Sequence, residues 1–264
     1  MNENININTK KVFFTMVKRD LLIQSRDWLE FVFRVAMLPF ILILIYGYVL
    51  PRIGVLSTDF PNQMFPGMLG MSLLVTGIHG TAVPLSMDFN NSREIEDRLQ
   101  APVDIRITAL SKMFVGIIES WIGALIVLPI SLVFMSAHLN FSMTPMDLVA
   151  TLGIVLLSSI TSATLGLLVG TIVKPMQIAA MFPGFLMPLI FSGAIFFDWK
   201  SLAPVPIFKA ITLLNPLVYI NEALRHTMNI GDGLPLIVCI IGILVFTVIM
   251  GYFGMKRFRK MAVR

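Results

Sequence analysis

The sequence predicts an all-α integral membrane protein with six transmembrane helices. Hydrophobic residues make up 56% of the 264 residues and charged residues only 13%, and the mean hydropathy is +0.85. A soluble domain carries about a quarter charged residues, because its surface faces water. Six apolar runs here reach the ~20 residues of helix that a bilayer core of about 30 Å requires. We therefore expect a single membrane domain over residues 1–264.

The six runs follow one another along the chain with short polar segments between them. Proline and glycine inside such runs are tolerated in membrane helices, where neighbouring helices satisfy the freed backbone groups. The lone Cys239 lies within the last run and forms neither a disulfide framework nor a Cys-based metal site. The predicted spans are 31–50, 64–87, 110–135, 148–173, 176–197 and 234–255.

The distribution of Lys and Arg predicts the orientation. Sixteen of the 20 lie in the N-terminal segment, between the second and third runs, between the fourth and fifth, or in the C-terminal tail. Positive residues are retained on the cytoplasmic side. We therefore expect a multi-pass protein of the plasma (cell inner) membrane with both termini in the cytoplasm. The net charge of +5 then reflects topology, and no basic stripe indicates nucleic-acid binding.

Residues 9–29 have the pattern of an amphipathic helix. Phe13, Val17 and Leu21 recur at a spacing of four, and Lys18 and Arg26 lie on the opposite face. Such a helix lies in the membrane surface with its apolar face buried at the headgroup boundary. The alternative is a plain positively charged flank of the first span.

The segment between the second and third runs is the most charged part of the chain. Asn91 followed by Glu94 resembles a helix N-cap with its N3 carboxylate, and Pro102 ends the helix. We expect a short cytoplasmic helix over 91–101, which is either a solvated connector or a docking surface for a soluble partner. Its charged residues are Arg93, Glu94, Glu96, Asp97 and Arg98.

The segment 198–233 is interrupted by prolines such as Pro204 and Pro206, and is too apolar for a free loop. Residues such as Phe208, Ile211 and Leu224 indicate two short helices that turn back toward the membrane. Because non-helical backbone at membrane depth must be covered by protein, we expect a packed hairpin outside the cell.

Two ionisable residues lie within predicted spans. His79 and Glu119 are placed at similar depth on the second and third spans, which leave the same loop in opposite directions. Ionisable residues inside a membrane are costly and indicate a function. Either the two side chains face each other or a shared polar cavity, or each is satisfied by a local Ser, Thr or backbone group. Phosphate-binding loops, zinc motifs and nucleophile elbows are absent from the sequence.

The charged loop and the outer segment together resemble the membrane subunit of type-2 ABC exporters, over nearly the whole chain. Residues 91–102, NSREIEDRLQAP, look like the inner-loop signature of that family. Residues 192–197 (SGAIFF), 214–217 (LNPL) and 222–225 (EALR) look like its outer hairpin. Each piece is weak alone, but their order and spacing against six spans match the family.

The resemblance implies an architecture and a set of partners. Residues 9–29 become an interface helix, 91–101 a coupling helix docked in a cytoplasmic ATPase, and 198–233 a re-entrant extracellular hairpin. Two ATPase subunits and a second permease, expected to be an identical copy, complete the transporter. ATP and Mg are bound by the ATPase, so this chain is expected to hold no cofactor or metal and to be no enzyme. The hairpin residues singled out are Asn215, Pro216, Glu222 and Arg225.

The implied activity is ATP-driven export by alternating access. The cargo is expected to be amphipathic, lipid-like or drug-like, with a glycan as the alternative. A Met- and Phe-rich stripe on the fifth span either lines the substrate path or packs against lipid and neighbours. Two other functions stay open, a proton-coupled secondary transporter using Glu119 and His79, and a membrane assembly subunit without transport. The stripe contains Met181, Phe182, Phe185, Met187 and Phe191.

Overall fold

The computed structural model describes residues 9–90, 104–136, 139, 142–173, 175–231 and 233–262. Every regular element within these ranges is helical. The α-helices are α1 Thr9–Arg26, α2 Trp28–Leu42, α3 Leu50–Arg52, α4 Phe60–Asn90, α6 Ile105–Met135, α7 Pro145–Gly170, α8 Ile178–Met181, α9 Met187–Phe191, α10 Pro206–Thr212, α11 Pro216–Thr227 and α12 Leu236–Ala262. The π-helical segments are Ile43–Val49 and Phe182–Leu186, and the 3-10 segments are Pro175–Gln177 and Lys200–Leu202.

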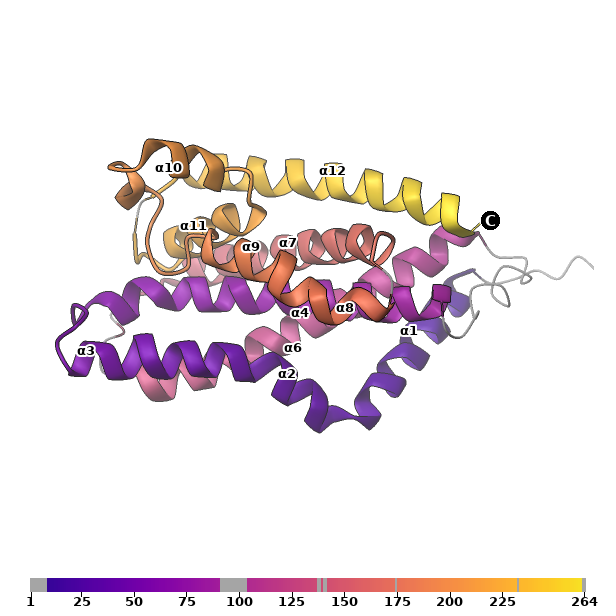
Figure 1. Ribbon diagram of the computed structural model, residues 1–264, viewed down its shortest axis with the longest axis horizontal. Helices are drawn as coiled ribbons and strands as arrows, with labels where there is room; N and C mark the ends of the chain where they lie inside the picture. The colour runs from indigo at the N-terminus through magenta and orange to yellow at the C-terminus, as the bar shows by residue number, and fades with distance from the viewer. Residues whose placement is uncertain are drawn as a thin grey trace, which may run out of the picture.

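Helix α4 is the centre of the bundle. It packs against α6 and α7 along most of its length and against α11 near its start. The helices run roughly side by side, and α1 and the last turns of α12 lie at the same end (Figure 1). We call this the loop end, because α4 ends and α6 begins there. The opposite end, with α10 and α11, is the hairpin end.

Five predicted spans are confirmed as helices that are long and apolar enough to cross a membrane. The first four stretches begin three to five residues before the predicted starts, because their first turns include polar residues that the apolar runs leave out, and the last begins two residues after its predicted start. The five stretches are Trp28–Arg52, Phe60–Phe89, Ile105–Met135, Pro145–Gly170 and Leu236–Met261.

The predicted fifth span, 176–197, is not one continuous helix. A 3-10 turn, α8, a π-helical segment and α9 follow one another, and the helical part ends at Phe191. Pro183 lies in the π-helical segment and Pro188 in α9. Each proline removes a backbone donor and crowds the preceding turn, so two prolines five residues apart prevent a regular helix. The expectation of one regular helix over 176–197 was therefore wrong, since residues 192–197 form a turn and bends. That this segment crosses the membrane stays a prediction.

The predicted amphipathic helix is present as α1, which ends at Arg26 rather than at residue 29. Asp27 leaves the helical conformation, with φ −108° and ψ 45°, and α2 begins directly after it at Trp28. The chain therefore bends between α1 and α2, which meet at an elbow beside the bundle (Figure 1). The placement of α1 in a membrane surface stays a prediction.

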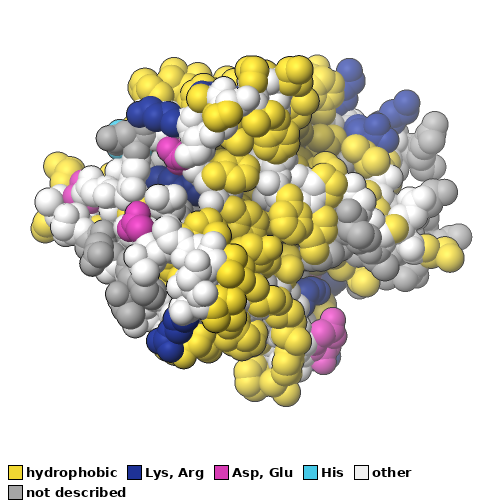
Figure 2. All heavy atoms as spheres, turned by 60° about the vertical axis from the view of Figure 1, so that its left-hand side comes forward, with side chains coloured by type: hydrophobic (Ala, Val, Ile, Leu, Met, Phe, Trp, Pro, Cys, Tyr) yellow, Lys and Arg dark blue, Asp and Glu magenta, His cyan; other side chains and the backbone are white. Residues whose placement is uncertain are grey.

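The surface of the bundle is apolar over its middle. Helix α12 buries little of its apolar stretch, whereas most of the corresponding stretch of α4 is buried. Figure 2 shows hydrophobic side chains over the middle of one face, with Lys, Arg, Asp and Glu toward its two ends. Such a distribution suits helices that face lipid.

Two hydrophobic cores hold the helices together. The larger one follows α4 and includes Met68 and Leu74, together with Leu217 and Leu224 of α11. The predicted pair of short helices within 198–233 is confirmed as α10 and α11. A much smaller core lies at the loop end and consists of Leu85, Ala109, Leu167 and Phe258.

Candidate functional site

The segment predicted to dock an ATPase, residues 91–101, lies outside the described residues, and its role stays a prediction. Both flanks of this segment are described. Helix α4 ends at Asn90, and Asp104 caps α6 by accepting a hydrogen bond from the Arg106 backbone N–H at 2.9 Å. The structure therefore fixes where the segment leaves and re-enters the bundle. The residues concerned are Arg93, Glu94, Glu96, Asp97 and Arg98.

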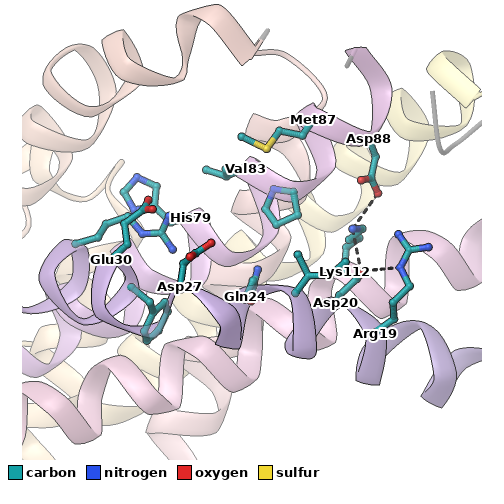
Figure 3. A pocket seen from close by; sticks show the side chains of 14 residues that line it. Arg19, Asp20, Gln24, Asp27, Glu30, His79, Val83, Met87, Asp88 and Lys112 are labelled. Atoms are coloured by element: carbon teal, nitrogen blue, oxygen red, sulfur yellow. Dashed lines mark ion pairs between the residues drawn. The ribbon is translucent and has the colours of Figure 1, made fainter. Parts of the chain in front are cut away.

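A buried ion cluster joins three helices beside these flanks. The Nζ of Lys112 on α6 lies 2.9 Å from Oδ2 of Asp20 on α1 and 2.9 Å from Oδ2 of Asp88 on α4. The three residues are 2%, 4% and 7% exposed. Arg19 reaches the other oxygen of Asp20 at 3.8 Å, and Figure 3 shows the four side chains converging. We call Asp20, Asp88 and Lys112 the lysine cluster.

The lysine cluster couples the elbow helix to the loop flanks. A buried ion pair is costly to break, because the partner left behind remains an uncompensated charge away from water. Lys112 therefore holds α1 against the last turn of α4 and the second turn of α6 at the same time. We expect these three segments to move together.

Sequence reasoning assigned none of the three members of this cluster to a site. Lys112 was counted only among the cations that set the orientation, and Asp20 and Asp88 were not singled out. One signal was available, since Lys112 lies between Leu110, Ala109, Met113 and Phe114 in an apolar helix. A lone cation in such surroundings requires a buried partner. The identity of Asp20 required knowledge that α1 packs against α6.

A cavity of about 370 Å³ lies between the α1–α2 elbow and α4. Charged residues of both signs line it, including the lysine cluster, Glu30 and Arg34. His79 of α4 also lines this cavity and is partly buried (Figure 3). The sequence-predicted histidine therefore lies in a charged cavity on one side of the elbow.

Glu119 lines a neighbouring cavity, whose lining does not include His79. Its carboxylate packs against Gly80 of α4, where an added Cβ would collide with it. Within the described residues neither carboxylate oxygen has a hydrogen-bond partner. A local Ser, Thr or backbone group thus does not satisfy Glu119, and no hydrogen bond joins it to His79. A shared function of the two residues stays a prediction.

The predicted hairpin residues lie together on α11, where they fix the turns that follow α9. Asn215 caps α11 by accepting from the Leu217 backbone N–H at 2.9 Å. Its amide nitrogen donates to the Leu189 carbonyl at 2.6 Å and to Ser192 Oγ at 3.0 Å. Pro216 follows in the first turn, where a missing N–H costs nothing.

Glu222 and Arg225 form a second buried charge pair, with Nη1 of Arg225 2.8 Å from Oε1 of Glu222. Arg225 also donates to the carbonyls of residues 194, 195 and 63 at 2.6, 3.0 and 3.2 Å. Glu222 accepts from the backbone N–H groups of residues 199 and 234, each at 3.0 Å. Burial lowers the pKa of Arg225 from its ordinary value, and Glu222 opposes that shift. The pair holds four backbone segments together.

The Met- and Phe-rich stripe is divided by the interruption of its helix. Met181 is buried in the main core, whereas Phe185 and Phe191 are exposed and Met187 is partly buried. The side chain of Phe182 lies outside the described residues. The stripe does not form one continuous face, and its contribution to a substrate path stays a prediction.

The fold and these clusters define a multi-helix membrane protein without an evident catalytic centre in its described part. Comparison with known families assigns it further. The model of the ABC-2 type transporter family matches residues 11–229, which is most of the chain. The chain therefore belongs to that family, and the resemblance to a type-2 ABC permease subunit is confirmed.

Curated relatives agree with this assignment. Inner membrane transport permease YadH of Escherichia coli strain K12 is 24% identical over 196 residues, which cover 74% of this chain and 72% of that protein. The YadH permease of Shigella flexneri is similar to the same extent.

Proposed function

We propose that the chain is the permease subunit of an ATP-driven exporter that moves an amphipathic, lipid-like or drug-like cargo. ATP is bound with Mg and hydrolysed on a separate cytoplasmic ATPase, present in two copies, while two copies of this chain form the translocation path. The chain itself performs no catalysis. It lies in the inner membrane with both termini in the cytoplasm, so that the loop end faces the ATPase and the hairpin end faces outward.

The observation that carries this proposal is the lysine cluster. An ATPase that docks on residues 91–101 pushes on the last turn of α4 and the first turns of α6. Lys112 transmits that displacement to α1 through Asp20, and α1 continues directly into α2, the first span. The cluster thus supplies a mechanical link from the docking segment to a helix that lines the proposed path.

The hairpin end supports the proposal in a different way. The fixed turns over 192–199 close the bundle at the end opposite the docking segment. The broken helix between Pro175 and Phe191 provides a segment that rearranges without breaking a regular backbone ladder. An exporter that works by alternating access requires a rigid gate and a deformable element, and both are available here.

The test is co-purification followed by a functional assay. We expect the tagged chain in mild detergent to retain a soluble ATPase with a phosphate-binding loop, in about equal amounts. The double variant E94K/E96K should lose this subunit, because it reverses the charge of the docking helix. Asp59→Lys, a reversal of an exposed acid at the hairpin end, serves as the matched control and should retain it.

Reconstituted vesicles then separate transport from assembly. The complex with the ATPase should export a fluorescent amphiphile only when ATP is supplied. Export that persists with a proton gradient and without ATP would favour the secondary transporter. A stable chain that neither retains an ATPase nor moves cargo would favour the assembly subunit.

A further inference from the structure

A second cavity lies on the other side of the α1–α2 elbow, between the elbow and α6. Its volume is about 240 Å³, and its exposed wall is almost entirely apolar. Trp28 and Phe31 of α2 and Ile122 and Ile126 of α6 supply much of that wall. Among the described residues that line it, Glu119 alone is ionisable. The cavity is thus an apolar chamber with a single carboxylate.

Two of the residues that line this chamber, Glu119 and Gln24, have buried acceptor oxygens without donors. Glu119 is 2% exposed, and neither of its carboxylate oxygens has a hydrogen-bond partner within the part of the chain that the structure describes. The side-chain oxygen of Gln24, which also lines the cavity, is buried and unpaired as well. An unpaired buried carboxylate costs several kcal/mol. A positively charged donor bound in the chamber would therefore stabilise Glu119.

Neither Arg34 nor Lys112 supplies this positively charged donor to Glu119. Arg34 acts on Glu119 electrostatically, but its side chain is exposed and lines the charged cavity on the other side of the elbow. No ion pair within 4.0 Å joins it to Glu119 among the described residues. Lys112 lies about 10 Å away along α6, at 1.5 Å of rise per residue, and is held by its own two carboxylates.

The walls indicate which kind of cation fits. A divalent metal ion requires about six oxygen ligands, and this chamber offers one carboxylate, one amide and one hydroxyl among apolar side chains. An organic ammonium requires only one counter-charge and is attracted to the faces of aromatic rings such as Trp28 and Phe31. Its alkyl substituents gain free energy by leaving water for the apolar wall.

We propose that this chamber binds a lipophilic organic cation, with Glu119 as its counter-ion and Trp28 and Phe31 against its ammonium group. As a cargo site it rests on the proposed export function, and it names the chemical class of the cargo. Its depth fits that role, since Glu119 lies about two helical turns beyond the lysine cluster, further from the loop end. A cation that has partitioned into the adjoining leaflet reaches it beside the elbow.

Binding is tested first, on the purified full-length chain in lipid nanodiscs. The probe is hexyltrimethylammonium, titrated by calorimetry with empty nanodiscs subtracted. Glu119→Gln keeps the shape of the side chain and removes its charge, and we expect at least a tenfold loss of affinity. Glu30→Gln is the matched control, because it neutralises an exposed carboxylate in the charged cavity, and affinity should stay within twofold.

A further variant tests the electrostatics without touching the chamber. Arg34→Gln removes the competing cation and should tighten probe binding several-fold, because the positive charge of Arg34 then no longer offsets the negative charge of Glu119. Equal binding by the native chain and Glu119→Gln, or no binding by the native chain, would overturn the proposal.

Transport is measured separately, so that the two proposals fail in different ways. Inverted vesicles containing the complete complex should accumulate the probe with ATP, and Glu119→Gln should reduce the rate about as much as it reduces affinity. Glu119-dependent binding without ATP-driven uptake would contradict the proposed export function and still support the proposed binding site. ATP-driven movement of another amphiphile, with no Glu119-dependent binding, would do the reverse.

Discussion

The two buried charge clusters, one at each end of the bundle, are built on opposite plans. At the hairpin end, Glu222 and Arg225 belong to one helix and form most of their hydrogen bonds with backbone groups of other segments. At the loop end, Lys112 meets two side chains from two other helices. The first plan fixes backbone turns, whereas the second joins helices only through side chains.

The two charge clusters also differ in how tightly their surroundings are packed. The hairpin pair lies beside the large core around α4, and both residues are 1% exposed. The lysine cluster lies beside the small four-residue core and borders an open cavity. The helix segments that the lysine cluster joins over a small core can move as a group relative to the rest of the bundle, whereas turns fixed through their backbone cannot move. The molecule therefore combines a fixed end with an adjustable one.

The largest effect should come from Arg225→Met. It leaves Glu222 buried without a counter-charge and removes the donors of three carbonyls, so we expect a loss of about 3–5 kcal/mol of folding free energy. The melting temperature of the detergent-purified chain, followed by size-exclusion elution, measures it. Arg52→Met, at an exposed arginine stacked on Tyr48 at the same end, is the control and should change little. Similar melting of both variants would contradict a fixed hairpin end.

An intermediate effect is expected for Lys112→Met, which leaves Asp20 and Asp88 close together without their shared counter-ion. The open cavity lets water or a proton reach them, so the expected loss is about 1–3 kcal/mol. The triple variant D20N/K112M/D88N should recover most of the stability, because replacing a whole buried ion cluster is often neutral. Its ATP-driven transport should nevertheless fall, since the link between α1 and the docking segment is gone.

The corresponding double variant at the hairpin end sharpens the comparison. The double variant E222Q/R225M also removes both charges, but the carbonyls of residues 194, 195 and 63 still lack their donors. Stability should therefore not recover. Recovery in both double and triple variants would show that the two clusters follow the same plan.

The smallest effect is expected for Asn215→Ala, which removes the cap of α11 and costs about 1 kcal/mol. Asn215→Ser keeps an acceptor for the cap but loses the amide that donates to the Leu189 carbonyl. It should therefore fall between the native chain and the alanine variant in melting temperature. An alanine variant as stable as the native chain would mean that Pro216 alone fixes the start of α11.

Sequence reasoning recovered what depends on local pattern. Apolar run length located five spans, and the three prolines with the apolar residues between them located α10 and α11. The interruption at Pro183 was underestimated, because a single proline is tolerated in a membrane helix and only the combination with Pro188 disrupts this one. The pairing of Lys112 with Asp20 depends on helix packing over a sequence separation that no local pattern reports.

The same division applies to the candidate sites. Glu119 was identifiable as an ionisable residue in an apolar run, but its lack of a partner is a property of the packed helices. Conversely, Asn215, Glu222 and Arg225 were named through a family resemblance, and their hydrogen bonds with backbone N–H and carbonyl groups give a physical reason why these residue types stand there.

Cys239, the lone cysteine of the sequence, has a practical consequence. It is fully buried in α12, with its sulfur 3.8 Å from the Leu234 carbonyl oxygen. A thiol so enclosed reacts slowly with water-soluble reagents. A spin label or fluorophore will thus modify a cysteine introduced at an exposed position, and Cys239 does not have to be replaced first. Pairs of labels placed on α1 and α10 would then report, in one molecule, how far the adjustable end travels while the fixed end stays in place.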